Sequence, residues 1–153
     1  MRTILVIVML TFISSAQEQI TDFSQLMNNL KKGKTVKVVI DYSKCLLVVD
    51  GKDTIATKDT PRAMGGMEFR TWEYFDTMVV KNKNAFVSTS ESILINHSRY
   101  GYITNYARLK IFDNNKAEIL IRYLDNYREV VDETFYTIIN DKKNNSGLFL
   151  FAY

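Results

Sequence analysis

Residues 102–123 read YITNYARLKIFDNNKAEILIRY and contain the clearest strand pattern of the chain. Ile103, Leu109 and Ile111 fall on one side of an extended segment, while mostly polar residues fall on the other. The polar run 113–116 then reverses the chain, and apolar residues alternate again over 117–123. Alternation with period two on both sides of a short polar turn predicts two adjacent antiparallel strands, each buried on one face.

Strand signals continue on both sides of this pair. The segments 35–42, 46–49, 54–56, 67–80, 85–89, 93–95, 129–140 and 147–153 carry further strand patterns, mostly β-branched and aromatic residues. Asp50-Gly51 is typical of a hairpin turn, and Pro61 with Gly65-Gly66 predicts a loop over 58–66. The segment 67–80 is long enough for one bent strand or for two strands joined at Asp76.

Only one helix is predicted, over residues 22–32. Asp22 suits its N-cap, Gln25 follows three residues later, and Gly33 supplies the stop. An apolar stripe at helical spacing runs along it: Phe23, Leu26, Met27 and Leu30. The predicted fold class is therefore mainly β (α+β), with an N-terminal helix followed by an antiparallel meander of about eight or nine strands in a curved or barrel-like sheet.

The first sixteen residues have the composition of a secretory signal peptide. Arg2 precedes an apolar run over 4–13, and Ser14-Ser15-Ala16 supplies small residues at a cleavage site. The run is shorter than the roughly 20 residues that a membrane-spanning helix needs. We therefore expect residues 1–16 to be removed and 17–153 to form one secreted or extracellular domain, periplasmic if the source is bacterial, with no membrane span.

Charge and composition narrow the classes of partner and site. The formal net charge of +3 is too small to indicate a nucleic-acid partner. One histidine and one cysteine argue against a metal site, and no cofactor is expected. Cys45 is either buried as a small apolar residue or free for a bond to a second chain, giving a possible homodimer. Asn96 and Asn144 each begin an Asn-x-Ser sequon and are glycosylation candidates.

The segment after the predicted helix resembles the VirK family of small exported proteins. The match begins with Leu26-Met27, Leu30 and Gly33 and runs into VKVVIDYSKC at 36–45. It continues with Gly65-Gly66 before an aromatic segment, with 85–88, and with the strand pair 106–112 and 117–121. The resemblance implies a family without an established biochemical activity, so no catalytic residues carry over. Cys45 matches the family's cysteine position, but this chain has no second cysteine to pair with it.

No catalytic motif stands out, since His97 lies in a polar stretch typical of the surface and no nucleophile pattern accompanies it. Aromatic and arginine side chains together suit a ligand surface, although ordinary sheet packing uses them too. The residues proposed to line such a surface are Trp72, Tyr74, Tyr106, Arg108 and Tyr123. The predicted function is a secreted, non-enzymatic binding protein for a small apolar or aromatic ligand or a protein partner.

Two alternatives remain open at this point. The first is a structural or assembly protein linked through Cys45 or an edge strand. The second is a carboxylate-dependent hydrolase that uses residues such as Glu68, Glu73 and Asp76, because a pair of carboxyl groups across a cavity can act as acid and base.

Overall fold

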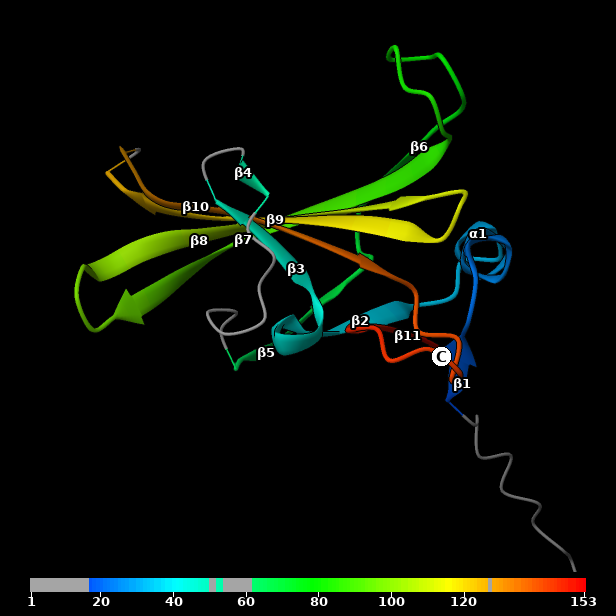
Figure 1. Cartoon of the computed structure of the whole chain (residues 1–153), viewed down its shortest axis with the longest axis horizontal. Helices are drawn as coiled ribbons and strands as arrows, with labels where there is room; N and C mark the ends of the chain where they lie inside the picture. The colour runs from blue at the N-terminus through cyan, green and yellow to red at the C-terminus, as the bar shows by residue number, and fades with distance from the viewer. Residues whose placement is uncertain (1–16, 50–51, 54–61, 127) are drawn as a thin grey trace, which may run out of the picture.

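The computed structural model describes residues 17–49, 52–53, 62–126 and 128–153, which form two antiparallel sheets and one α-helix (Figure 1). The mainly β fold predicted from the sequence is confirmed. The strands of these residues form two separate sheets and no closed barrel. The predicted signal peptide, the turn at Asp50-Gly51, the strand 54–56 and the loop residues 58–61 lie outside the described residues.

The two sheets differ in size. The smaller has the order β1 (Glu18–Ile20), β11 (Leu148–Ala152), β2 (Val36–Asp41) and β5 (Met64–Glu68). The larger has the order β4 (Lys52–Asp53), β3 (Leu46–Val49), β10 (Arg128–Ile138), β9 (Lys116–Asp125), β8 (Gly101–Phe112), β7 (Phe86–His97) and β6 (Trp72–Phe75). Helix α1 (Phe23–Lys31) connects β1 to β2, and the short 3-10 turn η1 (Tyr42–Lys44) follows β2.

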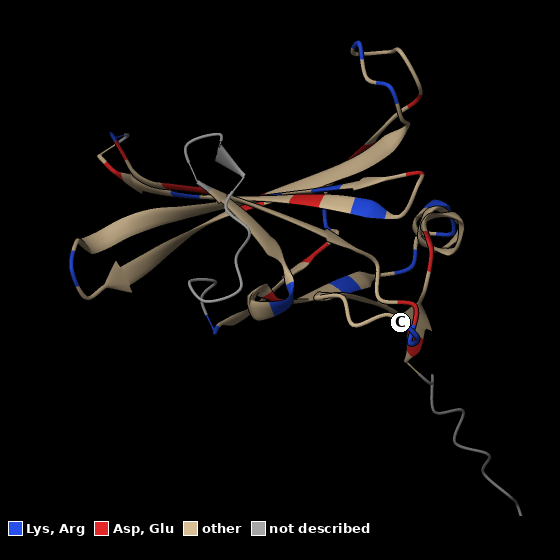
Figure 2. Cartoon of the chain, viewed as in Figure 1, with Lys and Arg blue, Asp and Glu red and all other residues tan. Residues whose placement is uncertain are grey.

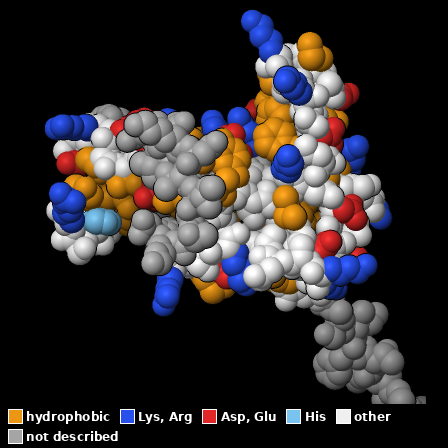
Figure 3. Space-filling model, in the orientation of Figure 1, with side chains coloured by type: hydrophobic (Ala, Val, Ile, Leu, Met, Phe, Trp, Pro, Cys, Tyr) orange, Lys and Arg blue, Asp and Glu red, His pale blue; other side chains and the backbone are white. Residues whose placement is uncertain are grey.

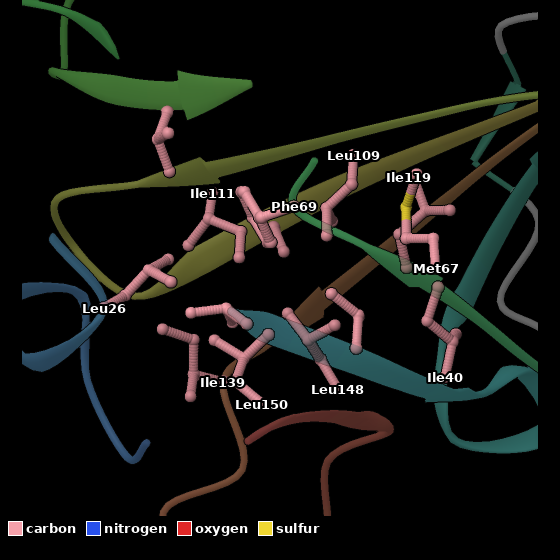
Figure 4. Close-up of a cluster of buried hydrophobic side chains, with 14 of the residues drawn as sticks. Leu26, Ile40, Met67, Phe69, Leu109, Ile111, Ile119, Ile139, Leu148 and Leu150 are labelled. Atoms are coloured by element: carbon pink, nitrogen blue, oxygen red, sulfur yellow. The ribbon is translucent and has the colours of Figure 1, made fainter. Parts of the chain in front are cut away.

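The core lies between the two sheets and is filled by their own side chains (Figure 4). The strand pair predicted over 102–123 pairs as β8 and β9, with Leu109 opposite Ile119 and Ile111 opposite Ala117. The same face buries Phe135 on β10, and the smaller sheet contributes Val38 and Leu150. Apolar side chains at alternate positions of both sheets thus meet as the hydrophobic effect requires.

Helix α1 begins and ends within one residue of the predicted bounds. The Asp22 carboxylate accepts a 2.8 Å hydrogen bond from the Gln25 backbone N–H, and the Gln25 side-chain oxygen accepts one from the Thr21 N–H. At the other end Gly33 has φ +73° and donates its N–H to the Leu30 carbonyl. These contacts satisfy groups that the helix leaves unpaired at its ends.

Three local predictions were wrong. Gly65-Gly66 lies within β5 rather than in a loop, because both residues pair with β2, Gly65 with Ile40 and Gly66 with Val39. The positions need glycine, since a side chain at Gly65 would meet the Tyr42 ring and one at Gly66 would meet the Val38 carbonyl at 2.8 Å. The segment 67–80 breaks after β5, well before Asp76, and its two strands belong to different sheets. The predicted strands 85–89 and 93–95 are one continuous strand, β7.

The long strands extend the larger sheet beyond the smaller one. Strands β7 to β10 contain 12, 12, 10 and 11 residues, whereas those of the smaller sheet contain 3 to 6. One end of the larger sheet therefore projects past the smaller sheet (Figure 1). We call this end the overhang and define it as residues 91–107 and 121–133, without 127. Its inner face is the face that continues the core.

Candidate functional site

The inner face of the overhang carries the best candidate site of the described residues. Two residues along from the buried Leu109–Ile119 pair, the register brings Ala107 opposite Ile121, and two further along Asn105 opposite Tyr123. Tyr123 is also the partner of Val131 on β10. The remaining inward side chains of β7 and β8 are the charged Glu91, opposite Ala107, and the apolar or aromatic Ile93, Ile95, His97 and Ile103. Figure 3 shows apolar side chains gathered beside the histidine at this end.

Tyr42 lies at the boundary between the core and the overhang. Its ring centroid is 4.8 Å from that of Phe135, and the missing side chain of Gly65 leaves room for it on the opposite sheet. Burial, together with the nearby Cys45, Tyr123 and Glu133, raises the pKa of Tyr42 to about 12. The phenol therefore stays protonated and can donate a hydrogen bond at any ordinary pH.

Two polar groups lie near the tyrosines of this face, Glu133 near Tyr42 and Asn105 opposite Tyr123. Glu133 makes no ion pair or hydrogen bond with the described residues, and burial raises the pKa of its carboxyl above the ordinary value. The Asn105 side-chain oxygen is buried without a hydrogen-bond partner. Buried polar atoms are normally paired, so the unpaired Asn105 oxygen, on a face that also holds a half-buried carboxyl, is a group that a ligand can satisfy.

His97 is less exposed than its polar sequence context predicted. Its ring lies 5.0 Å from the Tyr100 ring and 5.6 Å from the Tyr123 ring, centroid to centroid. Its Nδ1 accepts a 3.1 Å hydrogen bond from the Arg99 backbone N–H. The imidazole therefore extends the aromatic surface of the overhang. No serine or cysteine hydroxyl or thiol among the described residues is hydrogen-bonded to it.

We expect Glu133→Gln to make the protein slightly more stable near neutral pH and to leave its stability unchanged below about pH 4. A carboxyl whose pKa is raised by folding holds its proton more tightly in the folded state, so folding loses stability as the pH rises through the folded-state pKa. Glutamine cannot ionise and removes this loss. The gain is expected to be small, because the group keeps partial contact with solvent.

Thermal unfolding at about pH 4 and about pH 7 measures this difference. The matched control is Glu129→Gln on the same strand, where Glu129 is 3.3 Å from Arg122 and its loss is expected to bring no gain. If both variants respond to pH in the same way, Glu133 is not the desolvated carboxyl described above.

The five residues that the sequence proposed as a lining do not come together. Tyr123 belongs to the inner face of the overhang, while Trp72 and Tyr74 lie on the same face at the far end of β7, opposite Thr89 and Val87. The remaining two, Tyr106 and Arg108, lie on the outer face, where Arg108 is 3.2 Å from Glu118. Tyr42, Asn105 and Glu133 were not proposed as lining residues, because only the register and the position of η1 bring them beside Tyr123.

The carboxylates of the hydrolase alternative are likewise apart. Glu68 lies on the outer face of the smaller sheet and is 3.0 Å from Arg70. Glu73 lies on the outer face of the larger sheet, opposite Ser88, and Asp76 accepts the Thr77 backbone N–H in the following loop. Over the described part of the chain, no three His, Cys, Asp or Glu residues are grouped to hold a metal ion.

Cys45 is buried and 5% exposed, with its Sγ donating to the Asp41 carbonyl at 3.4 Å. Burial raises the pKa of the thiol to about 11, which keeps it protonated and unreactive near neutral pH. Of the two sequon residues, Asn96 is exposed on β7. The Asn144 side chain donates to the Ile139 carbonyl and accepts from Ser146, so it holds the turn before β11.

Comparison with known proteins gives two matches. The model of the family described as VirK protein matches residues 19–128. The crystal structure of a VirK family protein from Legionella pneumophila has a TM-score of 0.63 and 12% sequence identity, over 87% of this chain and 98% of that one. At this identity the structural likeness concerns the fold alone. No curated protein matches the chain.

Proposed function

The chain belongs to the VirK family, whose description gives no reaction, so we propose a function from this chain's own residues. We propose that the protein is an exported, non-enzymatic binding protein for a small apolar or aromatic ligand. The ligand contacts the inner face of the overhang. The observation that carries the proposal is the buried, unpaired Asn105 oxygen, together with the half-buried Glu133 carboxyl and the rings of Tyr42 and Tyr123. Such a surface combines apolar area with a few polar atoms that orient a ligand.

Further features support the other parts of the proposal. Export rests on the basic, apolar and small-residue order of residues 1–16. A non-enzymatic role is favoured because Glu68, Glu73 and Asp76 lie on separate surfaces. The assembly alternative through Cys45 is disfavoured, because its buried Sγ would have to be uncovered before it could bond to a second chain.

A protein partner is the second candidate, and a specific observation favours it. Leu94 is 71% exposed and Tyr102 is 74% exposed on the outer face of the same overhang. They are diagonal neighbours, because Leu94 is opposite Thr104 and Tyr102 is opposite Asn96. Large apolar side chains with this exposure are typical of protein contact surfaces.

The test uses N-phenylnaphthylamine, a neutral aromatic dye whose fluorescence rises in apolar surroundings. We expect saturable binding to the wild-type protein, and an affinity about tenfold weaker in Tyr123→Ala because one aromatic contact is lost. The matched control is Tyr106→Ala, which removes an equally half-buried tyrosine from the outer face of the neighbouring strand. Its affinity is expected to equal that of the wild type.

Two results would contradict the proposal of a small-ligand site. One is the absence of saturable dye binding by the folded wild-type protein. The other is equal weakening by Tyr123→Ala and Tyr106→Ala, which would mean that the inner face is not the site.

A further inference from the structure

Residues 76–84, most of the loop between β6 and β7, project away from both sheets and from α1 (Figure 1). Its tip consists of three consecutive apolar residues. Met78 is 70% exposed, Val79 is 65% exposed and Val80 is 51% exposed. Their apolar, β-branched composition predicts a strand, yet they pair with no strand of the described residues and contribute nothing to the core. Exposing three neighbouring aliphatic side chains to water costs free energy, and the packing of the core does not require that exposure.

A dense set of hydrogen bonds holds this loop in shape. Met78 donates its N–H to the Asn82 carbonyl at 3.0 Å, and Val80 donates its N–H to the Asn82 side-chain oxygen at 3.0 Å. The Asn82 amide in turn donates to the carbonyls of Asp76 and Asn84 at 2.9 and 2.8 Å. The backbone therefore presents the apolar tip outward in one conformation rather than exposing it by chance.

The charges around the tip are arranged asymmetrically. Lys81 follows the tip directly with φ +61°, and Lys83 lies two residues further on; both are exposed. The only acidic residue of the loop is Asp76 at its base, where the carboxylate accepts the Thr77 N–H at 2.7 Å. Figure 2 shows basic residues in the outer part of the loop and an acidic one at its base.

We propose that this loop docks on an anionic lipid membrane, with the side chains of Met78, Val79 and Val80 inserted among the lipids and Lys81 and Lys83 on the headgroups. The tip is convex and small, whereas a stable protein interface buries about 800 Å² on each partner. A bilayer accepts a few aliphatic side chains at its surface, and its negative headgroups complement flanking lysines. The loop lies at the opposite end of β7 from the overhang, so the two proposals are independent.

The test is flotation of the purified protein with vesicles of phosphatidylcholine, either alone or mixed in equal parts with phosphatidylserine. We expect the protein to float with the mixed vesicles and Val79→Asp to reduce the bound fraction at least tenfold. The matched control is Leu94→Asp, because Leu94 is 71% exposed on the outer face of β7. It places the same new charge at an equally exposed apolar position and is expected to bind like the wild type.

The combined change of Lys81→Gln and Lys83→Gln tests the electrostatic part. Two lysines near an anionic surface contribute about 2 kcal/mol, so affinity for the mixed vesicles should fall roughly 30-fold. Binding to phosphatidylcholine alone should not change. None of these side chains contributes to the core, so each variant is expected to keep the fold. Thermal unfolding of each variant checks this.

Three outcomes would overturn the proposal. The wild-type protein could fail to float with either kind of vesicle, or Val79→Asp and Leu94→Asp could bind equally well, which would place the membrane contact elsewhere. The third outcome is that sedimentation shows a dimer, and that Val79→Asp dissociates this dimer without changing flotation. The tip would then be a protein contact.

Discussion

Replacing Phe135 with alanine is expected to lower the free energy of unfolding by about 3–5 kcal/mol. Phe135 is 1% exposed, and its ring lies 4.8 Å from the ring of Tyr42. It is also the cross-strand partner of Ile119 on β9 and Leu47 on β3. Removing the ring leaves a cavity at the point where the larger sheet, η1 and the smaller sheet meet, and the surrounding strands cannot close it without breaking their pairing.

Urea unfolding followed by circular dichroism measures this loss. Tyr102→Ala is the control, since Tyr102 is an aromatic residue that is 74% exposed, and its loss should cost less than about 0.5 kcal/mol. If Phe135→Ala fails to fold, Phe135→Leu should still fold with a cost of about 1.5 kcal/mol or less. Equal effects of Phe135→Ala and Tyr102→Ala would contradict the core described above.

Gly147→Ala is expected to cost about 1–3 kcal/mol through overpacking. A Cβ at Gly147 would overlap the Asp41 carbonyl and lie 2.9 Å from the Cys45 Sγ. Moving the Gly147 backbone away from Asp41 would weaken the 2.8 Å hydrogen bond that the Asp41 N–H donates to the Gly147 carbonyl. The same carbonyl of Asp41 accepts from Cys45, and its carboxylate accepts from the Ser43 hydroxyl at 2.6 Å.

The control for this prediction is Gly101→Asn. Gly101 has φ +71° and open space around the position of a side chain, and asparagine tolerates that backbone conformation. Its cost should stay near 0.5 kcal/mol. Adding Cys45→Ala to Gly147→Ala should restore only part of the loss, because the overlap with the Asp41 carbonyl remains. Full restoration would show that the sulfur alone is the obstacle.

Asp41, Ser43 and Cys45, which lie within the VKVVIDYSKC segment of the family resemblance, have structural roles in the turn after β2. The Asp41 carboxylate caps η1 by accepting from both the N–H and the hydroxyl of Ser43. These hydrogen bonds lower the pKa of Asp41, with Lys44 at 3.2 Å contributing as well. The turn seats Cys45 in the core and places the Tyr42 ring against Phe135. In this chain these residues therefore build a tight corner rather than a reactive centre.

The candidate site was only partly predictable from the sequence. The alternation along 102–123 assigned Ile103, Leu109 and Ile111 to one face, and the structure buries all three. Tyr123 was proposed for a lining and lies on the candidate site, but Tyr106 and Arg108 were grouped with it although they face the other way. Alternation alone separates Tyr106 and Arg108 from Ile103 and Leu109, but which residues meet across neighbouring strands depends on the pairing register, and that register is not contained in the alternation of a single strand.

The exposed loop at 76–84 shows a second kind of limit. The run Met78–Val80 looks like part of a strand because its residues are apolar and β-branched. The hydrogen bonds of Asn82 and the positive φ of Met78 and Lys81 turn the chain instead. Local propensity is a weak preference, and a network of side-chain hydrogen bonds to the backbone outweighs it here.

The sequence by itself determined the helix from its caps, strands β8, β9 and β10 from their alternation, the mainly β class and the family resemblance, because each depends on residues close together in the chain. Only the tertiary structure decided that the strands form two sheets, that one sheet overhangs the other, and that Tyr42, Tyr123 and Glu133 lie together. These features depend on contacts between distant segments, whose free energies depend on register and packing rather than on local composition.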